Sequence, residues 1–352
     1  MTLKPGPTNS LTDLVGLRVG HYTADTDGFL TGTTVIVGEA DGFVAGVDVR
    51  GGGPGTHETD LLDPINSVER VHAIVLGGGS AFGLAAISGV QDAMRSEGRG
   101  LEVLPGVIVP IVPGAIVFDL GRSGVVNSTP DAAFGKKAYE DAKSASGSKK
   151  VKTGTVGAGT GAMAGGIKGG IGSASVVLSD GTTIAALIVL NSVGSALNSK
   201  TGEVYGIAYG LGNEFAHLGK PSAADLAKAP GHIALLDNGK FPEALSLNTT
   251  IGFVGTDVAL TKAQCKKLAG IGQDGLARSI HPVHSMFDGD TIFAGSTAKN
   301  PSPNPAQFHE ILTAAADCVS RAVAHALLDA TAVRTPAITL PSYLDLFPSA
   351  KI

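Results

Sequence analysis

Short runs of apolar and β-branched residues, bounded by glycine, aspartate or asparagine, recur along the chain. Runs of this kind predict β-strands. The expected strands cover residues 33–37, 42–49, 73–76, 103–112, 173–178, 183–190, 249–258 and 291–294. Residues 179–181 read Ser-Asp-Gly and would join two of these strands in a hairpin. Pro105 and Pro110 interrupt the run at 103–112, which we expect to be a strand with bends.

A second pattern, with apolar residues three or four positions apart, predicts helices over residues 80–95, 130–144, 262–280 and 305–330. The clearest apolar face belongs to the last of these and is made by Phe308, Ile311, Leu312, Ala315, Val319, Ala322, Val323 and Leu327. Because groups of strands alternate irregularly with helices, the pattern favours a layered α/β fold over a strict βαβ repeat.

Three segments lack a strong periodic pattern. Residues 1 to about 12 contain prolines and polar residues, and we expect a mobile or draped N-terminal arm. Residues 145–152 are rich in serine, glycine and lysine and predict a loop. Residues 196–248 are mostly polar and turn-forming, with one short apolar run at 233–236, and predict an exposed connection.

Composition narrows the class of protein. The chain has 352 residues, of which 43% are hydrophobic and 16% are charged, enough to bury a large core. The net charge of -5 and the lack of a basic run argue against a nucleic-acid partner. No apolar stretch of signal-peptide or membrane-spanning length stands out, so we expect a cytoplasmic protein without a membrane partner. Cys265 and Cys318 are too few for a disulfide framework and are expected to be buried thiols.

Glycine is unusually frequent, at 50 of 352 residues, without a collagen period. Its abundance indicates tight turns and closely packed backbones, as in layered sheets. The glycine-rich stretch from Gly77 to Gly83 does not match the dinucleotide-binding motif or the hydrolase nucleophile elbow, because Phe82 occupies the position of the required glycine. We therefore expect no cofactor, and interpret Ser80 as a helix N-cap.

Two histidines and two aspartates raise the question of a metal. His281 and His284 have the spacing of metal ligands, and Asp288 and Asp290 follow them. The turn around Gly289 lacks the further oxygen ligands of a calcium loop, so we expect no metal and, from the bare pattern, a solvated turn. In the same way, Asn248-Thr249-Thr250 alone predicts only a turn that leads into a strand.

Several separate stretches together carry a family resemblance over residues 13–330. They are 19–21 (VGH), 48–62 (DVRGGGPGTHETDLL), 73–83 (AIVLGGGSAFG), 110–120, 157–175, 191–194, 248–251 and 284–293. The chain resembles the L-aminopeptidase/D-esterases and β-peptidyl aminopeptidases, a family that includes the nylon-oligomer (6-aminohexanoate-oligomer) hydrolases. The resemblance implies a four-layer αββα sandwich like that of N-terminal-nucleophile hydrolases. It also implies a single domain over 13–352, cut into an α-chain (1–248) and a β-chain (249–352).

In that family the precursor cuts itself before a serine or threonine, which matches a cut between Asn248 and Thr249 here. A hydroxyl is a weak nucleophile at neutral pH, and the α-amino group freed by the cut, with a pKa of about 8, can act as its base. The resemblance implies that Asp288 and Asp290 orient this amine and relay protons. The aspartate pair is similar to that of the nylon-oligomer hydrolases.

Three more residues match family site positions. Asn191 would stabilise the tetrahedral oxyanion with its amide. Lys168 would lower the pKa of the amine or support the oxyanion. Phe118 is a pocket candidate that stands where some members have a tyrosine, and it cannot donate a hydrogen bond. The two histidines are then expected to support the turn at Asp288.

The resemblance implies hydrolysis of amide bonds in small or linear substrates: 6-aminohexanoate oligomers, β-peptides and amino-acid amides. Alternatives are an aminopeptidase/D-esterase acting on ordinary short peptides and acyl transfer of the ornithine-acetyltransferase kind. A binding protein without activity would leave the chain uncut. The resemblance also implies a homo-oligomer, a tetramer of processed units.

Overall fold

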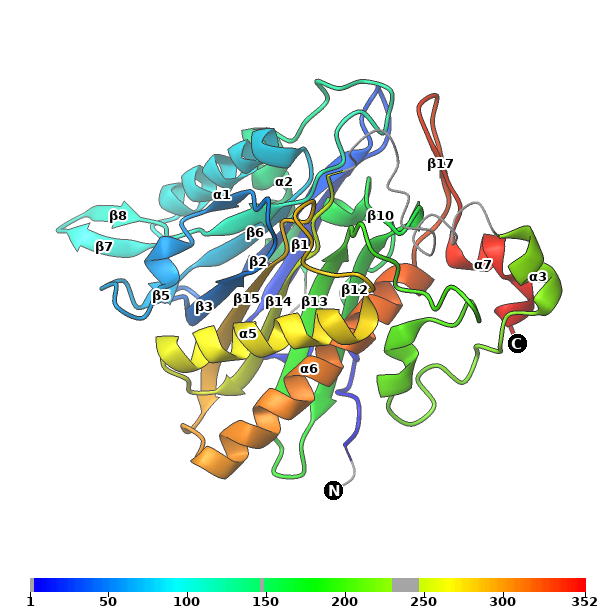
Figure 1. Ribbon diagram of the computed structural model, residues 1–352. Helices are drawn as coiled ribbons and strands as arrows, with labels where there is room; N and C mark the ends of the chain where they lie inside the picture. The colour runs from blue at the N-terminus through cyan, green and yellow to red at the C-terminus, as the bar shows by residue number, and fades with distance from the viewer. Residues whose placement is uncertain (1–2, 146–148, 230–246) are drawn as a thin grey trace.

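Two β-sheets lie face to face, and a pair of helices covers the outer face of each (Figure 1). The structure is a computed structural model that describes residues 3–145, 149–229 and 247–352. The expectation for 233–236 lies outside the described residues. The four layers confirm the αββα sandwich that the family resemblance implies.

The larger sheet has six strands. Their order is β12 (Gly170–Val177), β13 (Thr183–Leu190), β14 (Ile251–Val258), β15 (Thr291–Asn300), β3 (Phe43–Val49) and β5 (Arg70–Val71). All neighbours are antiparallel except β14 and β15, which are parallel with Ile251 opposite Thr291. This parallel pair decides where the candidate site forms, because the two strands begin at the same edge of the sheet.

The smaller sheet has five strands, in the order β1 (Arg18–Ala24), β2 (Thr31–Val37), β6 (Ala73–Gly77), β9 (Gly114–Ile116) and β4 (Thr56–His57). The other strands of the described ranges form three separate hairpins, β7–β8 (Leu101–Leu104, Val107–Val109), β10–β11 (Met163–Ala164, Ile167–Lys168) and β16–β17 (Val333–Arg334, Thr339–Leu340). Figure 1 shows the β7–β8 hairpin projecting from the body.

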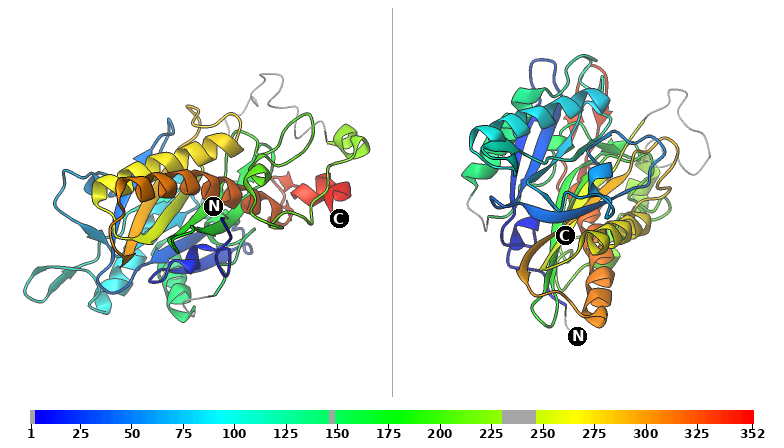
Figure 2. Two further views of the ribbon diagram at one scale, coloured as in Figure 1. Left: turned by 90° about the horizontal axis from the view of Figure 1, so that it is seen from below. Right: turned by 90° about the vertical axis from the view of Figure 1, so that its left-hand side faces the viewer.

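Helices α5 (Lys262–Ser279) and α6 (Pro305–Leu328) pack on the six-stranded sheet, while α1 (Ala85–Ser96) and α2 (Ala132–Ser144) cover the other (Figure 2). Capping boxes start α5 at Thr261 and α6 at Asn304. Among the described residues, the short helices are α3 (Ala223–Lys228), α7 (Tyr343–Leu346) and six 3-10 turns: 11–13, 60–62, 80–84, 157–159, 205–209 and 348–350.

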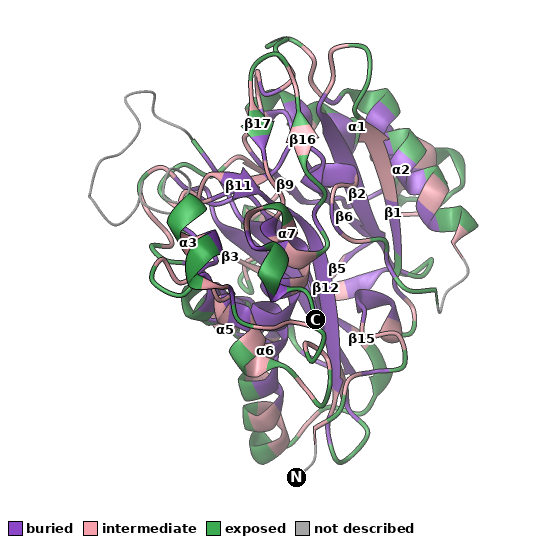
Figure 3. Ribbon diagram, turned by 90° about the vertical axis from the view of Figure 1, so that its right-hand side faces the viewer, coloured by how far each residue is buried: buried purple, intermediate pink, exposed green. Residues whose placement is uncertain are grey.

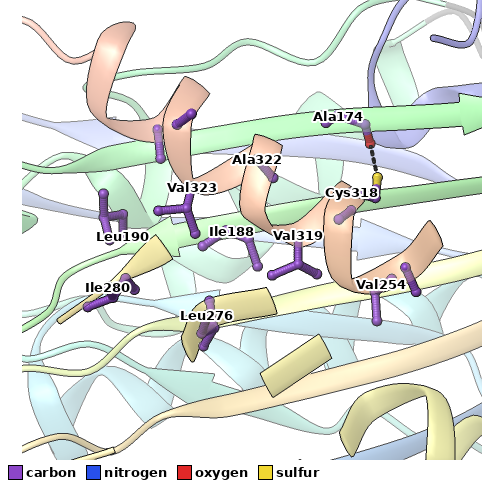
Figure 4. Packing of buried hydrophobic residues seen from close by; sticks show 14 of the residues in the cluster. Ala174, Ile188, Leu190, Val254, Leu276, Ile280, Cys318, Val319, Ala322 and Val323 are labelled. Carbon is purple, nitrogen blue, oxygen red and sulfur yellow. Dashed lines mark hydrogen bonds between the residues drawn. The ribbon is translucent and has the colours of Figure 1, made fainter. Parts of the chain in front are cut away.

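Three hydrophobic clusters separate the layers. One lies between the six-stranded sheet and its helices, one between the two sheets, and one under α1 and α2. Figure 3 shows that the strands of both sheets are largely buried. In the first cluster (Figure 4), Cys318 contacts the carbonyl oxygen of Ala174 at 3.2 Å. Both cysteines are free and buried, as expected, and burial raises the pKa of the Cys318 thiol to about 12.

Close approach of backbones explains part of the glycine content. A Cβ on Gly172 would lie 1.9 Å from the carbonyl oxygen of Ala322. Helix α6 therefore packs on β12 at a distance that no other residue at this position permits. Helix α6 is also long and apolar enough to cross a membrane, but 72% of its most apolar window is buried inside the protein, as in the core helix of a soluble fold.

The structure corrects two local expectations. Residues 103–112 form no single strand, because Pro105 and Gly106 turn the chain between β7 and β8. Ser80 is not a helix N-cap. It has a φ of 52°, its N–H donates to the carbonyl oxygen of Val117, and α1 begins only after a 3-10 turn over Ser80–Leu84.

The N-terminal residues from position 3 onward run along β12. The N–H groups of Gly6 and Leu11 donate to the hydroxyls of Ser175 and Ser173, at 3.1 and 2.8 Å. Leu11 is fully buried. The described part of this segment is thus draped over the sheet.

Candidate active site

The topology brings the matched residues to one edge of the six-stranded sheet. Thr249 lies two residues before β14, and Asp290 lies directly before the parallel strand β15. Asn191 directly follows β13, which is antiparallel to β14, and therefore lies at the same edge. Lys168 ends β11, two residues before β12. Residues far apart in the sequence meet here because of strand order.

Thr249 is held against the residue that precedes it. Both Asn248 and Thr249 are 3% exposed. The Thr249 hydroxyl donates to the carbonyl oxygen of Asn248 at 2.5 Å, and the N–H of Gly289 reaches the same oxygen at 3.2 Å. The backbone N–H of Thr249 donates to the carbonyl oxygen of Asn191 at 2.6 Å. A nucleophilic hydroxyl, the carbonyl it would attack and a hydrogen-bond donor to that carbonyl are thus assembled together.

Gly289 leaves room for this arrangement. A Cβ on Gly289 would lie 2.6 Å from the carbonyl oxygen of Gly53 and 2.8 Å from Oγ1 of Thr249. The glycine between the two aspartates therefore lets the backbone approach the threonine hydroxyl closely.

The two aspartates make different contacts. Asp288 accepts hydrogen bonds from the N–H of Val193 (3.1 Å) and from the N–H and hydroxyl of Ser285 (3.1 and 2.5 Å). Burial and then the charge of Asp290 raise the pKa of Asp288 above its usual range. Asp290 accepts from the N–H of Thr250 at 2.7 Å. Asp290 therefore fixes the backbone next to Thr249, while Asp288 is a buried carboxyl whose pKa is raised.

The histidines do not act as a pair. Nδ1 of His284 lies 2.8 Å from Oδ2 of Asp290, so this histidine supports Asp290, and Ser285 supports Asp288. The backbone of His281 pairs with Ser195, and its ring lies 4.5 Å from that of Tyr205. The expectation that both histidines support the turn at Asp288 is corrected accordingly. Within the three described ranges, no three histidine, cysteine, aspartate or glutamate side chains are grouped as metal ligands.

Arg122, which the sequence reasoning missed, joins two of the matched residues. It is 7% exposed and lies in the segment after β9. Its Nη1 donates to Oδ1 of Asn191 and to the carbonyl oxygen of Gly161, both at 2.6 Å, and its Nη2 donates to Oδ1 of Asn248 at 2.7 Å. Burial lowers the pKa of Arg122 to about 10, against the influence of Asp119. The arginine stays charged at neutral pH.

These bonds orient the Asn191 amide. Its Oδ1 also accepts from the N–H of Met163 at 2.9 Å, and its Nδ2 donates to the carbonyl oxygen of Phe118 at 3.2 Å. The donor that reaches the Asn248 carbonyl is the N–H of Gly289, while the Asn191 backbone holds the nitrogen of Thr249. The half-buried Phe118 contributes its backbone to the site.

Lys168 is fully buried behind this group. Its Nζ donates to the carbonyl oxygens of Gly159 and Gly169, at 2.8 and 2.6 Å. Burial and then the charge of Arg122 lower the pKa of Lys168 to about 7, with Asp119 acting in the opposite direction. An amine with this pKa can change its charge near neutral pH.

Comparison with known proteins identifies the family. The model of peptidase family S58 matches residues 9–339. The chain belongs to peptidase family S58. An S58 peptidase is an enzyme, and its reaction is hydrolysis of an amide bond.

The relatives of this S58 peptidase differ in how similar their sequences are to this chain. An uncharacterized aminopeptidase of Mycobacterium leprae is 44% identical over 99% of this chain and 97% of that protein. A 6-aminohexanoate-oligomer endohydrolase of a Kocuria species is 31% identical over 81% of this chain and 74% of that protein. The sequence resemblance to both branches of the family is thereby confirmed.

A solved structure matches the fold of this peptidase. The L-aminopeptidase D-Ala-esterase/amidase of Ochrobactrum anthropi, described as a variant of the N-terminal-nucleophile hydrolase fold, superposes with a TM-score of 0.68. The match covers 100% of this chain and 97% of that one, at 20% identity. The four-layer sandwich is therefore a variant of the N-terminal-nucleophile hydrolase fold.

Proposed function

We propose that the chain is a self-processing aminopeptidase that cuts itself between Asn248 and Thr249 and then uses Thr249 to hydrolyse short peptides or amino-acid amides. The observation that carries the proposal is the 2.5 Å contact between the Thr249 hydroxyl and the Asn248 carbonyl, in a site where Gly289 donates to the same oxygen. The products of the cut would be an α-chain of residues 1–248 and a β-chain of residues 249–352.

The contacts support a specific course for the cut. Oγ1 of Thr249 attacks the carbonyl carbon of Asn248, and the oxygen of that carbonyl takes up the negative charge near the N–H of Gly289. The bond from this carbon to the Thr249 nitrogen then breaks, and the nitrogen gains the proton that the hydroxyl loses. The result is an ester of Asn248 on Oγ1 and a free amine. Water hydrolyses the ester to a carboxylate and restores the hydroxyl.

The freed amine supplies the base for later turnovers. It stays within reach of the Asn191 carbonyl oxygen, which already lies 2.6 Å from the Thr249 nitrogen. The neutral amine accepts the hydroxyl proton as Oγ1 attacks the substrate carbonyl, and passes it to the leaving amine. Asp290 holds the adjacent backbone through Thr250, and the negative charge of Asp290 contributes to the raised pKa of Asp288.

The relatives favour ordinary peptides over nylon oligomers. The relative named an aminopeptidase is 44% identical over 99% of this chain, whereas the relative named an oligomer endohydrolase is 31% identical over 81%. We therefore place short peptides, the substrates of the aminopeptidase alternative, before the 6-aminohexanoate oligomers that the sequence alone favours. The threonine with two aspartates keeps the oligomers as a second candidate class.

The test begins with denaturing electrophoresis and N-terminal sequencing of the purified protein. We expect two chains, the smaller beginning Thr-Thr-Ile-Gly, and one full-length chain for Thr249→Val, which keeps the volume but lacks the hydroxyl. A wild-type chain that stays whole would overturn the proposal. The processed enzyme is then assayed for amine release from dipeptides, amino-acid amides, β-peptides and 6-aminohexanoate oligomers, with acetylornithine plus glutamate as the acyl-transfer arm.

Assembly and location complete the proposal. We propose a tetramer of processed units, which light scattering of the purified enzyme would measure, and a cytoplasmic location, which fractionation of the source cells would test.

A further inference from the structure

Arg122 is a buried cation that makes no ion pair with any described residue. Its three side-chain hydrogen bonds go to neutral oxygens, on Gly161, Asn191 and Asn248. Asp119 influences it only through space. Burying a charge without a carboxylate partner costs stability. Arg122 is buried in spite of this cost and binds Asn248, the residue before the proposed cut, which indicates a role in the reaction.

We propose that Arg122 is a positioning residue for self-processing, which holds the Asn248 side chain so that the carbonyl of Asn248 stays in reach of the Thr249 hydroxyl. The inference rests on the proposed function. It assigns the role to one bond, from Nη2 of Arg122 to Oδ1 of Asn248 at 2.7 Å.

Asn248 is fixed at three points. Its N–H donates to the carbonyl oxygen of Phe287 at 3.0 Å, its own carbonyl oxygen accepts from Gly289 at 3.2 Å, and its side chain is bound by Arg122. The peptide group between Asn248 and Thr249 is held as well, because the N–H of Thr249 donates to the carbonyl oxygen of Asn191 at 2.6 Å. The bond from Arg122 adds a restraint on the Asn248 side chain, and so helps to keep the carbonyl of Asn248 oriented towards Oγ1.

The planar guanidinium suits this task. Its two terminal nitrogens bind Asn191 and Asn248 at the same time, so the guanidinium sets the distance between these two residues. Asn248 precedes the proposed cut, and the carbonyl oxygen of Asn191 accepts a hydrogen bond from the Thr249 nitrogen. A lysine has a single nitrogen and cannot make both contacts in a fixed plane. The geometry therefore distinguishes arginine from a general need for positive charge.

The experiment measures the rate of the cut by intact-mass spectrometry after rapid purification of the precursor. Asn248→Ala is expected to slow the cut by about ten- to a hundred-fold, the effect of losing one hydrogen bond from a charged group. Arg122→Met removes the same bond together with the bonds to Asn191 and Gly161, and is expected to slow the cut by at least as much. The double variant is expected to be no slower than the slower single variant, because both changes remove the same bond. Arg122→Lys is expected to recover part of the rate.

Arg321→Met is the matched control. Arg321 is also a buried arginine, 1% exposed, but its side chain binds Glu214, Asn9 and the Ser175 carbonyl away from the site. We expect it to lower the unfolding temperature and to leave the rate of the cut unchanged. Near-ultraviolet circular dichroism of each uncut chain checks that the variants are folded.

The outcomes separate the two proposals. A wild-type chain that never cuts removes the proposed function. A wild-type chain that cuts, with Arg122→Met or Asn248→Ala cutting at the same rate, overturns the positioning role and leaves the function in place. Additive effects in the double variant also overturn it, because Arg122 would then act by another route. If Arg122→Met does not fold, Arg122→Lys and Asn248→Ala decide the question.

Discussion

Oγ1 of Thr249 lies 2.5 Å from the carbonyl oxygen of Asn248, so the nucleophile and the bond it would cut belong to neighbouring residues. This contact needs the hydroxyl and makes no use of the β-methyl group. We predict that Thr249→Ser still cuts itself, within about ten-fold of the wild-type rate. Serine keeps the attacking hydroxyl, and loss of the methyl group affects only how firmly that hydroxyl is oriented. Mass spectrometry over time measures the rate. Complete loss of cutting in Thr249→Ser would contradict this account.

The Gly289 backbone is predicted to be intolerant of any side chain. In Gly289→Ala the new Cβ would start 2.8 Å from Oγ1 of Thr249 and 2.6 Å from the Gly53 carbonyl oxygen. The shift needed to relieve this contact would move the N–H of Gly289 away from the Asn248 carbonyl. We expect processing to slow by about a hundred-fold or more, as on loss of an oxyanion donor, with stability lowered by about 1–3 kcal/mol. Gly181→Ala, where no atom lies within 4 Å of the added Cβ, controls for the substitution, although its φ of 90° carries local strain.

Much of the fold could be predicted from local patterns. The strand at 183–190 follows from its run of β-branched and apolar residues, and α6 follows from apolar residues spaced three or four positions apart. Both elements form where expected. The error at 103–112 had a visible signal, since Pro105-Gly106 is a turn dipeptide. Strand order could not be derived locally, because it depends on contacts between distant segments. The layered sandwich came from the family resemblance.

The candidate site likewise contains residues that could be predicted from the sequence and one that could not. Thr249, Asp288 and Asp290 stand beside strand ends, but only the parallel pairing of β14 and β15 shows why they meet. Arg122 carries no motif, because a single arginine between glycine and serine has the pattern of an exposed turn. Its burial beneath Asn248 is a property of the fold and could not be read from spacing.

The two aspartates are predicted to be electrically coupled. Burial and the charge of Asp290 both raise the pKa of Asp288. Asp290→Asn removes the negative charge of Asp290, so the pKa of Asp288 should fall, although burial still raises it. Carbon-13 NMR of labelled aspartate carboxyls, in a Thr249→Val background that keeps one chain, would measure the titration, and Asp288→Asn would assign the signal. An unchanged or higher midpoint would contradict the coupling.

Lys168 is predicted to make stability depend on pH. Its pKa in the folded protein, about 7, lies below the ordinary value of 10.5, so between these values the unfolded chain binds more protons. The free energy of unfolding should therefore rise with pH across this window, by up to about 1.4 kcal/mol per pH unit relative to Lys168→Met. Urea unfolding of both proteins at pH 7, 8 and 9, in the Thr249→Val background, tests this. Parallel pH profiles would show that Lys168 is not shifted.

Glu214 anchors a charged network away from the site. Its carboxylate is 3% exposed and accepts hydrogen bonds from Arg321, at 2.7 and 2.9 Å, from Asn9 at 2.6 Å, and pairs with His325 at 2.7 Å. Burial would raise the pKa of Glu214, but the hydrogen bonds from His325 and Arg321 outweigh it and hold that pKa well below its usual range. Glu214→Gln removes the charge and leaves Arg321 buried without a carboxylate, which should cost about 3–5 kcal/mol at pH 7.

The pH dependence of that loss gives the sharper test. Because the pKa of Glu214 is lowered on folding, its contribution to stability is fully present above the ordinary value of 4.5 and declines as the pH falls below it. The difference in unfolding free energy between wild type and Glu214→Gln should therefore shrink as the pH falls from 5 towards 3.5. Urea unfolding in the Thr249→Val background measures it, and a difference that grows on acidification would mean that the carboxylate is not stabilised by its partners. Because the network does not touch Asn248, the rate of the cut in an otherwise wild-type Glu214→Gln chain should be unchanged, which separates loss of stability from loss of the site.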